Sequence, residues 1–186
     1  ANEFVWAGSL TADPTTEIPG YDTPAAPGGA VLDRLGNGAL AISADVIRFD
    51  AAPYTMATSL VPANRLVLGF SSVTLDAAKQ VTAKGTGSLA VHHTVTGYEG
   101  GQGWQYSGGD LIVRTPLLTS EAAAALDVRA GGALTVHGTG ATPGSSDALG
   151  GALSLAARRI ALDTTVALSS GKLTLDAQED ITLGYA

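Results

Sequence analysis

The sequence has no cysteine, few aromatic residues and few basic residues, and each shortage excludes a class of protein. None of the 186 residues is Cys, which excludes a disulfide framework and thiolate metal sites. Ten Lys and Arg stand against 17 Asp and Glu, giving a net charge of −7 without any basic run. We therefore expect no nucleic-acid partner. No stretch of 18 apolar residues occurs, so the sequence predicts no membrane insertion.

A short phrase recurs along the chain: Gly, any residue, Leu, any residue, then Leu, Ile or Val. It begins at Gly38, Gly87, Gly109, Gly132, Gly151 and Gly171, and also at Asn64 with Asn in place of Gly. Successive starts lie 26, 23, 22, 23, 19 and 20 residues apart. A period of this size is typical of a solenoid, in which each repeat is one coil.

Each repeat has the pattern of short strands. The two aliphatic residues of the phrase are two positions apart, so they share one side of an extended chain. A second such pair follows about seven residues later: Ile47/Phe49 after Leu40/Ile42, Val73/Leu75 after Leu66/Leu68, and Ile160/Leu162 after Leu153/Leu155. A third strand is expected at 81–83 and at 166–168, and the Ala-rich segment 120–127 reads as a turn. The sequence predicts an all-β fold, a parallel β-helix of about seven coils, with Gly permitting the turns before its strands.

The chain divides into two regions. Residues 1–37 are rich in Pro, Thr and Gly and read as a linker, wrap or cap, with Trp6 packing against the solenoid. Residues 38–186 form the β-solenoid, interrupted by a long loop at 93–108 and a plainer one at 137–150. The chain begins at Ala1 without Met, and we expect it to be part of a longer protein.

The segments 150–162 and 171–183 carry the pattern most regularly: GGALSLAARRIAL and GKLTLDAQEDITL. They resemble filamentous haemagglutinin repeats, the coils of large bacterial exoproteins exported by two-partner secretion. The resemblance is good over 150–186, fair over 38–136 and absent over 1–37. It implies a right-handed parallel β-helix, an outer-membrane transporter as export partner, and adhesive work at the surface of a Gram-negative bacterium.

The loop at 93–108 is the most distinctive candidate contact site. Tyr98, Trp104 and Tyr106 lie within nine residues among several glycines. Exposed aromatic rings can stack on sugars or anchor a protein partner, and insertions in solenoids often form the binding surface. The alternative is that Trp104 folds back over an apolar part of the solenoid. Both interpretations remain open from the sequence.

Other candidates for chemistry carry less weight. Asp50 and Asp76 each follow a predicted second strand, and stacked on neighbouring coils they would suit a polysaccharide lyase or glycoside hydrolase. An Asp that begins a turn is the more ordinary interpretation. His92 and His93 are adjacent and would point to opposite sides of a strand, so we expect no metal site there.

The sequence therefore favours a non-catalytic, secreted or surface-exposed adhesin segment without cofactor or metal. Its expected partner is a host-cell receptor, a glycan or a biofilm matrix. The alternatives are a β-helix enzyme acting on polysaccharide through Asp50 and Asp76, and a purely structural solenoid or cap without a ligand.

Overall fold

The computed structural model describes residues 2–7, 10–11, 38–50, 63–99, 103–146 and 148–184. This part of the chain is all-β: it contains no helix, and so none that is long and apolar enough to cross a membrane. The strands are β1 (Glu3–Trp6), β2 (Leu10–Thr11), β3 (Ala39–Phe49), β4 (Ala63–Leu68), β5 (Ser72–Ala83), β6 (Thr86–His92), β7 (Thr94–Glu99), β8 (Gly103–Ser107), β9 (Asp110–Arg114), β10 (Leu117–Thr119), β11 (Ala125–Ala130), β12 (Ala133–His137), β13 (Ala152–Asp163), β14 (Thr165–Ala167) and β15 (Lys172–Leu183).

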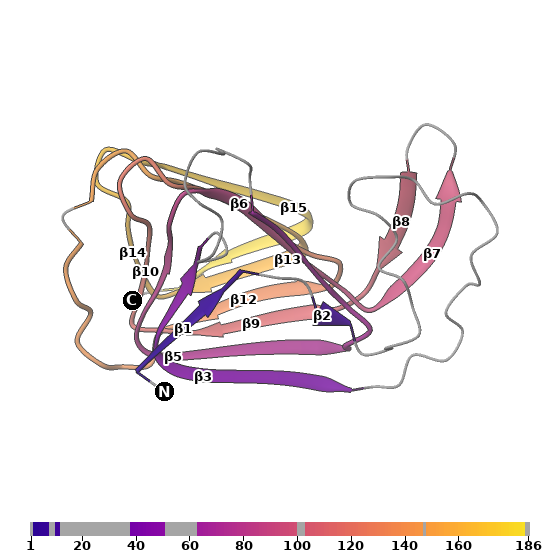
Figure 1. Ribbon diagram of the computed structural model, residues 1–186, viewed down its shortest axis with the longest axis horizontal. Helices are drawn as coiled ribbons and strands as arrows, with labels where there is room; N and C mark the ends of the chain where they lie inside the picture. Colours follow the sequence, from indigo (N-terminus) through magenta and orange to yellow (C-terminus); the bar gives the residue numbers. More distant parts are fainter. Residues whose placement is uncertain are drawn as a thin grey trace.

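Thirteen of these strands form one curled sheet whose strand pairs are all parallel, while β7 and β8 form a separate antiparallel pair (Figure 1). The paired segments fall into three columns. Column A contains 39–44 of β3, 72–77 of β5, β9, β12, 159–162 of β13 and 180–183 of β15. Column B contains β2, β4, β6, β11, 152–157 of β13 and 172–177 of β15. Column C contains β1, 46–49 of β3, 80–83 of β5, β10 and β14.

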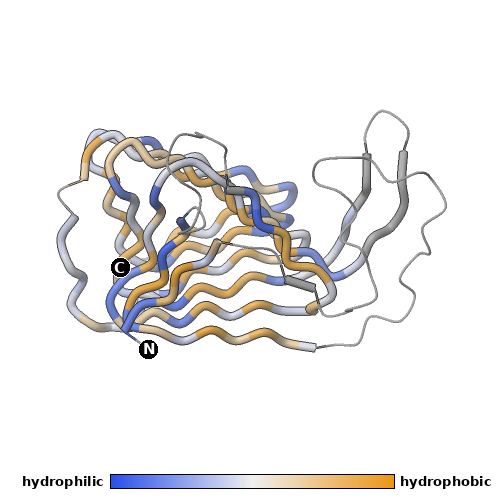
Figure 2. Tube along the Cα trace, viewed as in Figure 1, coloured by the Kyte–Doolittle hydropathy of each residue, from blue (hydrophilic) through white to orange (hydrophobic). Residues whose placement is uncertain are grey.

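Alternation of side chains explains why these segments are strands and where the core lies. In column A, Leu111 pairs with Leu134 and Leu134 with Ile160, and each is about 1% exposed. Residues between such positions are more polar or smaller, and Figure 2 shows this alternation along the stacked strands. Rows of aliphatic residues from successive strands therefore fill the inside of the curled sheet.

Long strands turn between columns without breaking. In β3 the register against β5 shifts between Ala44 and Val46, and in β13 the register against β15 shifts between Ala157 and Arg159. The expected pairs Leu40/Ile42 and Ile47/Phe49 thus lie on two columns of one strand. The third strands predicted at 81–83 and 166–168 are confirmed within β5 and β14, apart from Leu168, and the segment 120–124 is a turn, as expected.

The repeated phrases do not form a single stack, so the number of phrases is not the number of coils. Those starting at Gly38, Gly109 and Gly132 lie in column A, and those starting at Asn64, Gly87, Gly151 and Gly171 lie in column B. The phrases at 38 and 64 therefore lie in different columns, the first in column A and the second in column B. Successive spacings therefore mix steps within one column with steps between columns.

The phrase at Asn64 is also displaced by one residue. Its Arg65 pairs with Leu89 of the inner row, whereas Leu66 pairs with Ala90 on the outside. A shift of one residue exchanges the two sides of a strand. Leu66 and Leu68, expected in the interior, are buried in a separate cluster outside the main core.

Three of the six phrase glycines, Gly132, Gly151 and Gly171, are required by close packing rather than by turn conformation. Gly109 has a φ of 89° and fits the expectation, but Gly151 and Gly171 have no positive φ. A Cβ on Gly171 would meet the carbonyl oxygen of Gly151, and a Cβ on Gly151 would meet the side chain of Ser120. These glycines allow the backbones of successive strands to approach each other at the corner.

The two ends of the described sheet differ. At the first, β1 pairs with β3, and Trp6 is 3% exposed and stacks on Phe49 with ring centroids 5.8 Å apart, which confirms the expected packing of Trp6. At the other, β15 pairs only with β13 among the described strands. Its inner residues Leu173, Ile181 and Leu183 are 39–64% exposed.

Candidate functional site

The insertion predicted as a loop at 93–108 contains a β-hairpin. Strands β7 and β8 are antiparallel, and the register places Tyr98 opposite Trp104 and Val95 opposite Tyr106. The hairpin follows β6 of column B and precedes β9 of column A, and it stands apart from the large sheet (Figure 1). The site predicted from the sequence is therefore presented on a defined element.

The base of the hairpin is held by backbone and side-chain contacts. The hydroxyl groups of Thr94 and Ser107 lie 2.9 Å apart, and Gly108 forms an antiparallel bridge with Gly131 after β11. A Cβ on Gly131 would meet the carbonyl oxygen of Gly108 and would lie 2.9 Å from Nδ1 of His92. Glycine at 131 therefore lets the base of the hairpin lie directly against the sheet.

Tyr106 packs against the sheet. Its ring stacks on His92, with centroids 4.9 Å apart and an interplanar angle of 18°, and it contacts the outer cluster of Leu66, Leu68 and Ala90. Tyr106 therefore folds back over an apolar part of the solenoid, which is the alternative that the sequence suggested for Trp104. The side chains of Tyr98 and Trp104 lie outside the described residues, so their role as contact residues stays a prediction.

His92 is a partly buried, neutral part of this base. Burial, together with the smaller effect of the positive charge of Arg129, lowers the pKa of His92 to about 4. Its Nδ1 is buried without a hydrogen-bond partner among the described residues. A protonated ring there would carry a poorly solvated charge near the positive charge of Arg129, so the folded protein favours the neutral form of His92.

Acidification is expected to destabilise the protein through His92. Unfolded His92 binds a proton near the usual histidine pKa of 6.5, whereas in the folded protein its pKa is about 4. Its contribution is therefore complete above about pH 6.5 and is lost as the pH falls towards about 4, by on the order of 2 kcal/mol. Urea unfolding across this pH range measures the change.

The variant His92→Phe isolates this effect, because it keeps a ring for Tyr106 and cannot bind a proton. It should flatten the pH dependence, while His137→Gln, at an exposed position, should keep it. An unchanged slope in His92→Phe would contradict the assignment to His92.

The carboxylate column suggested by Asp50 and Asp76 is not formed. Asp76 lies in column A opposite Ser43, whereas Asp50 follows the column C part of β3. Asp50 instead forms ion pairs with Arg48 at 3.4 Å and Lys84 at 3.6 Å. Two residues at the ends of similar phrases lie in different columns because a coil carries more than one phrase.

No group of three or more metal-ligating side chains occurs in the described part of the chain. His92 stacks on Tyr106 and His137 pairs with Asp163 across column A, so these two histidines serve different parts of the sheet.

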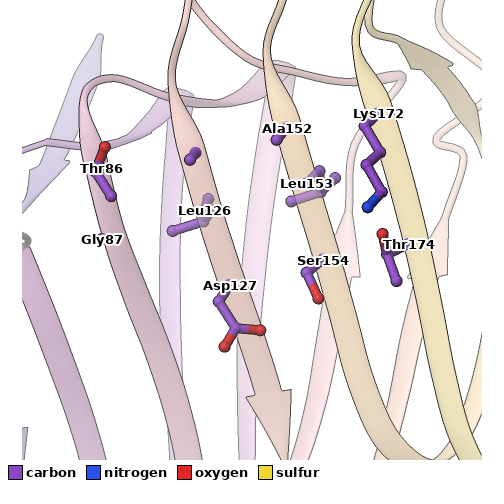
Figure 3. A pocket seen from close by; sticks show the side chains of 10 residues that line it. Thr86, Gly87, Leu126, Asp127, Ala152, Leu153, Ser154, Lys172 and Thr174 are labelled. Atoms are coloured by element: carbon purple, nitrogen blue, oxygen red, sulfur yellow. The ribbon is translucent and has the colours of Figure 1, made fainter.

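The structure also contains a groove that the sequence did not reveal. It has a volume of about 450 Å³ and crosses four neighbouring strands of column B (Figure 3). It is lined by Thr86, Gly87, Ala125, Leu126, Asp127, Ala152, Leu153, Ser154, Lys172 and Thr174. These residues come from β6, β11, β13 and β15, and only the register between the strands brings them together.

Comparison of the chain with protein-family models, with curated proteins and with solved structures finds no match. The geometry of the hairpin and of the groove is therefore the basis for assigning a function.

Proposed function

We propose that the protein is a non-catalytic segment of a secreted or surface-exposed bacterial adhesin of the filamentous haemagglutinin kind. In this proposal the three columns are the sides of a right-handed parallel β-helix. The chain passes from column A to column B five times, between 39 and 68, 72 and 91, 110 and 130, 133 and 157, and 159 and 177. Part turns at 3–11 and 180–183 flank these five passages.

The observation that carries the proposal is the combination of a stacked parallel sheet with one projecting hairpin. A solenoid of this kind is a long, rigid surface, and a binding element on it is typically an insertion between coils. The hairpin β7–β8 fulfils this description, and its base is fixed by the packing of Tyr106 on His92. We assign contact with a host-cell receptor, glycan or biofilm matrix to Tyr98 and Trp104.

The shaft role is supported by the edge of β15. Its row of Leu173, Ile181 and Leu183 continues the inner rows of the preceding strands but is largely exposed. An unpaired strand edge with an apolar inner row suits the stacking of another coil.

Replacing Trp104 with alanine is expected to lower binding to epithelial cells at least tenfold, because aromatic anchors contribute a large share of contact energy. Lys79→Ala is the control and should bind like the unmutated protein, because this 70% exposed side chain lies where β5 turns from column A to column C, whereas the hairpin lies between columns B and A. If Trp104→Ala bound as well as the control, the hairpin would not be the contact site. The protein would then be a structural shaft without this ligand.

A further inference from the structure

The shape of the groove on column B comes from two small residues that lie between two longer ones. Thr86, Ala125, Ala152 and Lys172 occupy one row, each paired with the next. The two alanines in the middle form a floor between the side chains of Thr86 and Lys172. With parallel strands about 4.8 Å apart, the four positions span about 14 Å.

One wall of the groove is a polar row. Asp127 pairs with Ser154, and Ser154 with Thr174, so these three side chains leave the sheet on the same outer side. Figure 3 shows them in a line across three strands, with the Lys172 side chain extending towards Thr174. Hydroxyl and carboxylate groups thus repeat at the strand spacing along the groove.

The carboxylate of Asp127 retains unused capacity to accept hydrogen bonds. Its Oδ2 accepts from Nε of Arg129 at 2.9 Å, while its Oδ1 is buried without a partner among the described residues. The side chain is about one-third exposed. A hydrogen-bond donor from a ligand at this carboxylate would satisfy the unpaired oxygen.

We propose that this groove is a second binding site, which takes a linear, uncharged carbohydrate chain. The ligand's hydroxyl groups donate to Asp127 and exchange hydrogen bonds with Ser154, Thr174 and Thr86. Lys172 is the one cation that lines the groove and Asp127 the one anion, so the lining is balanced in charge and suits a neutral ligand. A chain of repeating sugars matches polar groups that repeat from strand to strand. The site is separate from the hairpin and does not depend on the proposed function.

The test measures, by isothermal titration calorimetry, the binding of neutral linear hexasaccharides of glucose, N-acetylglucosamine, xylose and mannose. We expect at least one of them to bind. Asp127→Ala should weaken that binding roughly tenfold or more, since it removes a charged acceptor. Ala152→Phe, which fills the floor, should abolish it.

Two matched changes on the outside of column A control for general effects of substitution. Thr174→Val removes a groove hydroxyl and Thr74→Val removes one from column A; Ala152→Phe is matched by Ala41→Phe. Only the groove variants should lose affinity, and Trp104→Ala should bind the hexasaccharide like the parent protein. The proposal would be overturned if no hexasaccharide bound, or if the groove variants and the control variants had equal affinity. It would also be overturned if only Trp104→Ala lost affinity, because the hexasaccharide would then bind at the hairpin.

Discussion

Replacing Arg65 with methionine is expected to lower the free energy of unfolding by about 3 kcal/mol or more, because several carbonyl groups lose a charged donor inside the protein. Arg65 is 1% exposed, and its Nε donates to the carbonyl oxygen of Trp6 at 2.6 Å. Its two terminal nitrogens donate to the carbonyl oxygens of Asp50 and of Ser88. These three carbonyls belong to successive levels of the stack, so one side chain ties three levels together.

The position of Arg65 in the sheet explains why its loss is costly. It occupies an inner row that continues as Leu89, Val128, Leu155 and Leu175. Burial lowers the pKa of Arg65 below its usual value and nearby Asp50 opposes this shift, so the guanidinium depends on its protein partners in place of water. Its carbon atom Cζ also lies 5.7 Å from the centre of the Phe49 ring.

Arg158→Met is the matched control, because that side chain is 51% exposed and forms only a surface ion pair with Glu179. It should change stability by less than about 1 kcal/mol. Arg65→Lys tests the geometry: it keeps the charge but loses the planar fork, and should be destabilised nearly as much as Arg65→Met. Equal urea midpoints for Arg65→Met and Arg158→Met would contradict the role assigned to Arg65.

Truncation of Leu153 to alanine is expected to cost about 2–5 kcal/mol, whereas the same change at Leu173 should cost about 1 kcal/mol or less. The two leucines are direct partners in the register of β13 and β15 and belong to one inner row. Leu153 is 3% exposed and Leu173 is 39% exposed, because β15 has no further strand packed on it among the described residues.

This pair is internally controlled, since residue type, strand position and column are the same. Urea unfolding of both variants gives the comparison directly. If Leu173→Ala were as destabilising as Leu153→Ala, then the edge of β15 would be covered in solution and the stack would not end as described.

The sequence predicted the local elements well because alternation is a local property. The strands at 40–49, 73–83 and 153–162 follow from aliphatic residues two positions apart, and the turn before β11 follows from its composition. The packing of Trp6 was also predictable, since a large aromatic residue in a polar segment needs a partner.

Register was not predictable, and the errors come from it. Leu66 and Leu68 carry the same phrase as Leu89 and Val91, yet β4 is displaced by one residue and places Arg65 inside. Because the register is not visible in the sequence, a column of Asp50 and Asp76 was expected and the groove was not. The alanines at 125 and 152 are visible in the sequence, but nothing in it pairs them.

The most direct test of the functional account is a binding titration of the labelled protein on epithelial cells, with unlabelled protein as competitor. The account predicts saturable binding that the competitor removes and that Trp104→Ala weakens. Absence of saturable binding to cells would contradict it and would leave the protein as a structural solenoid without this ligand.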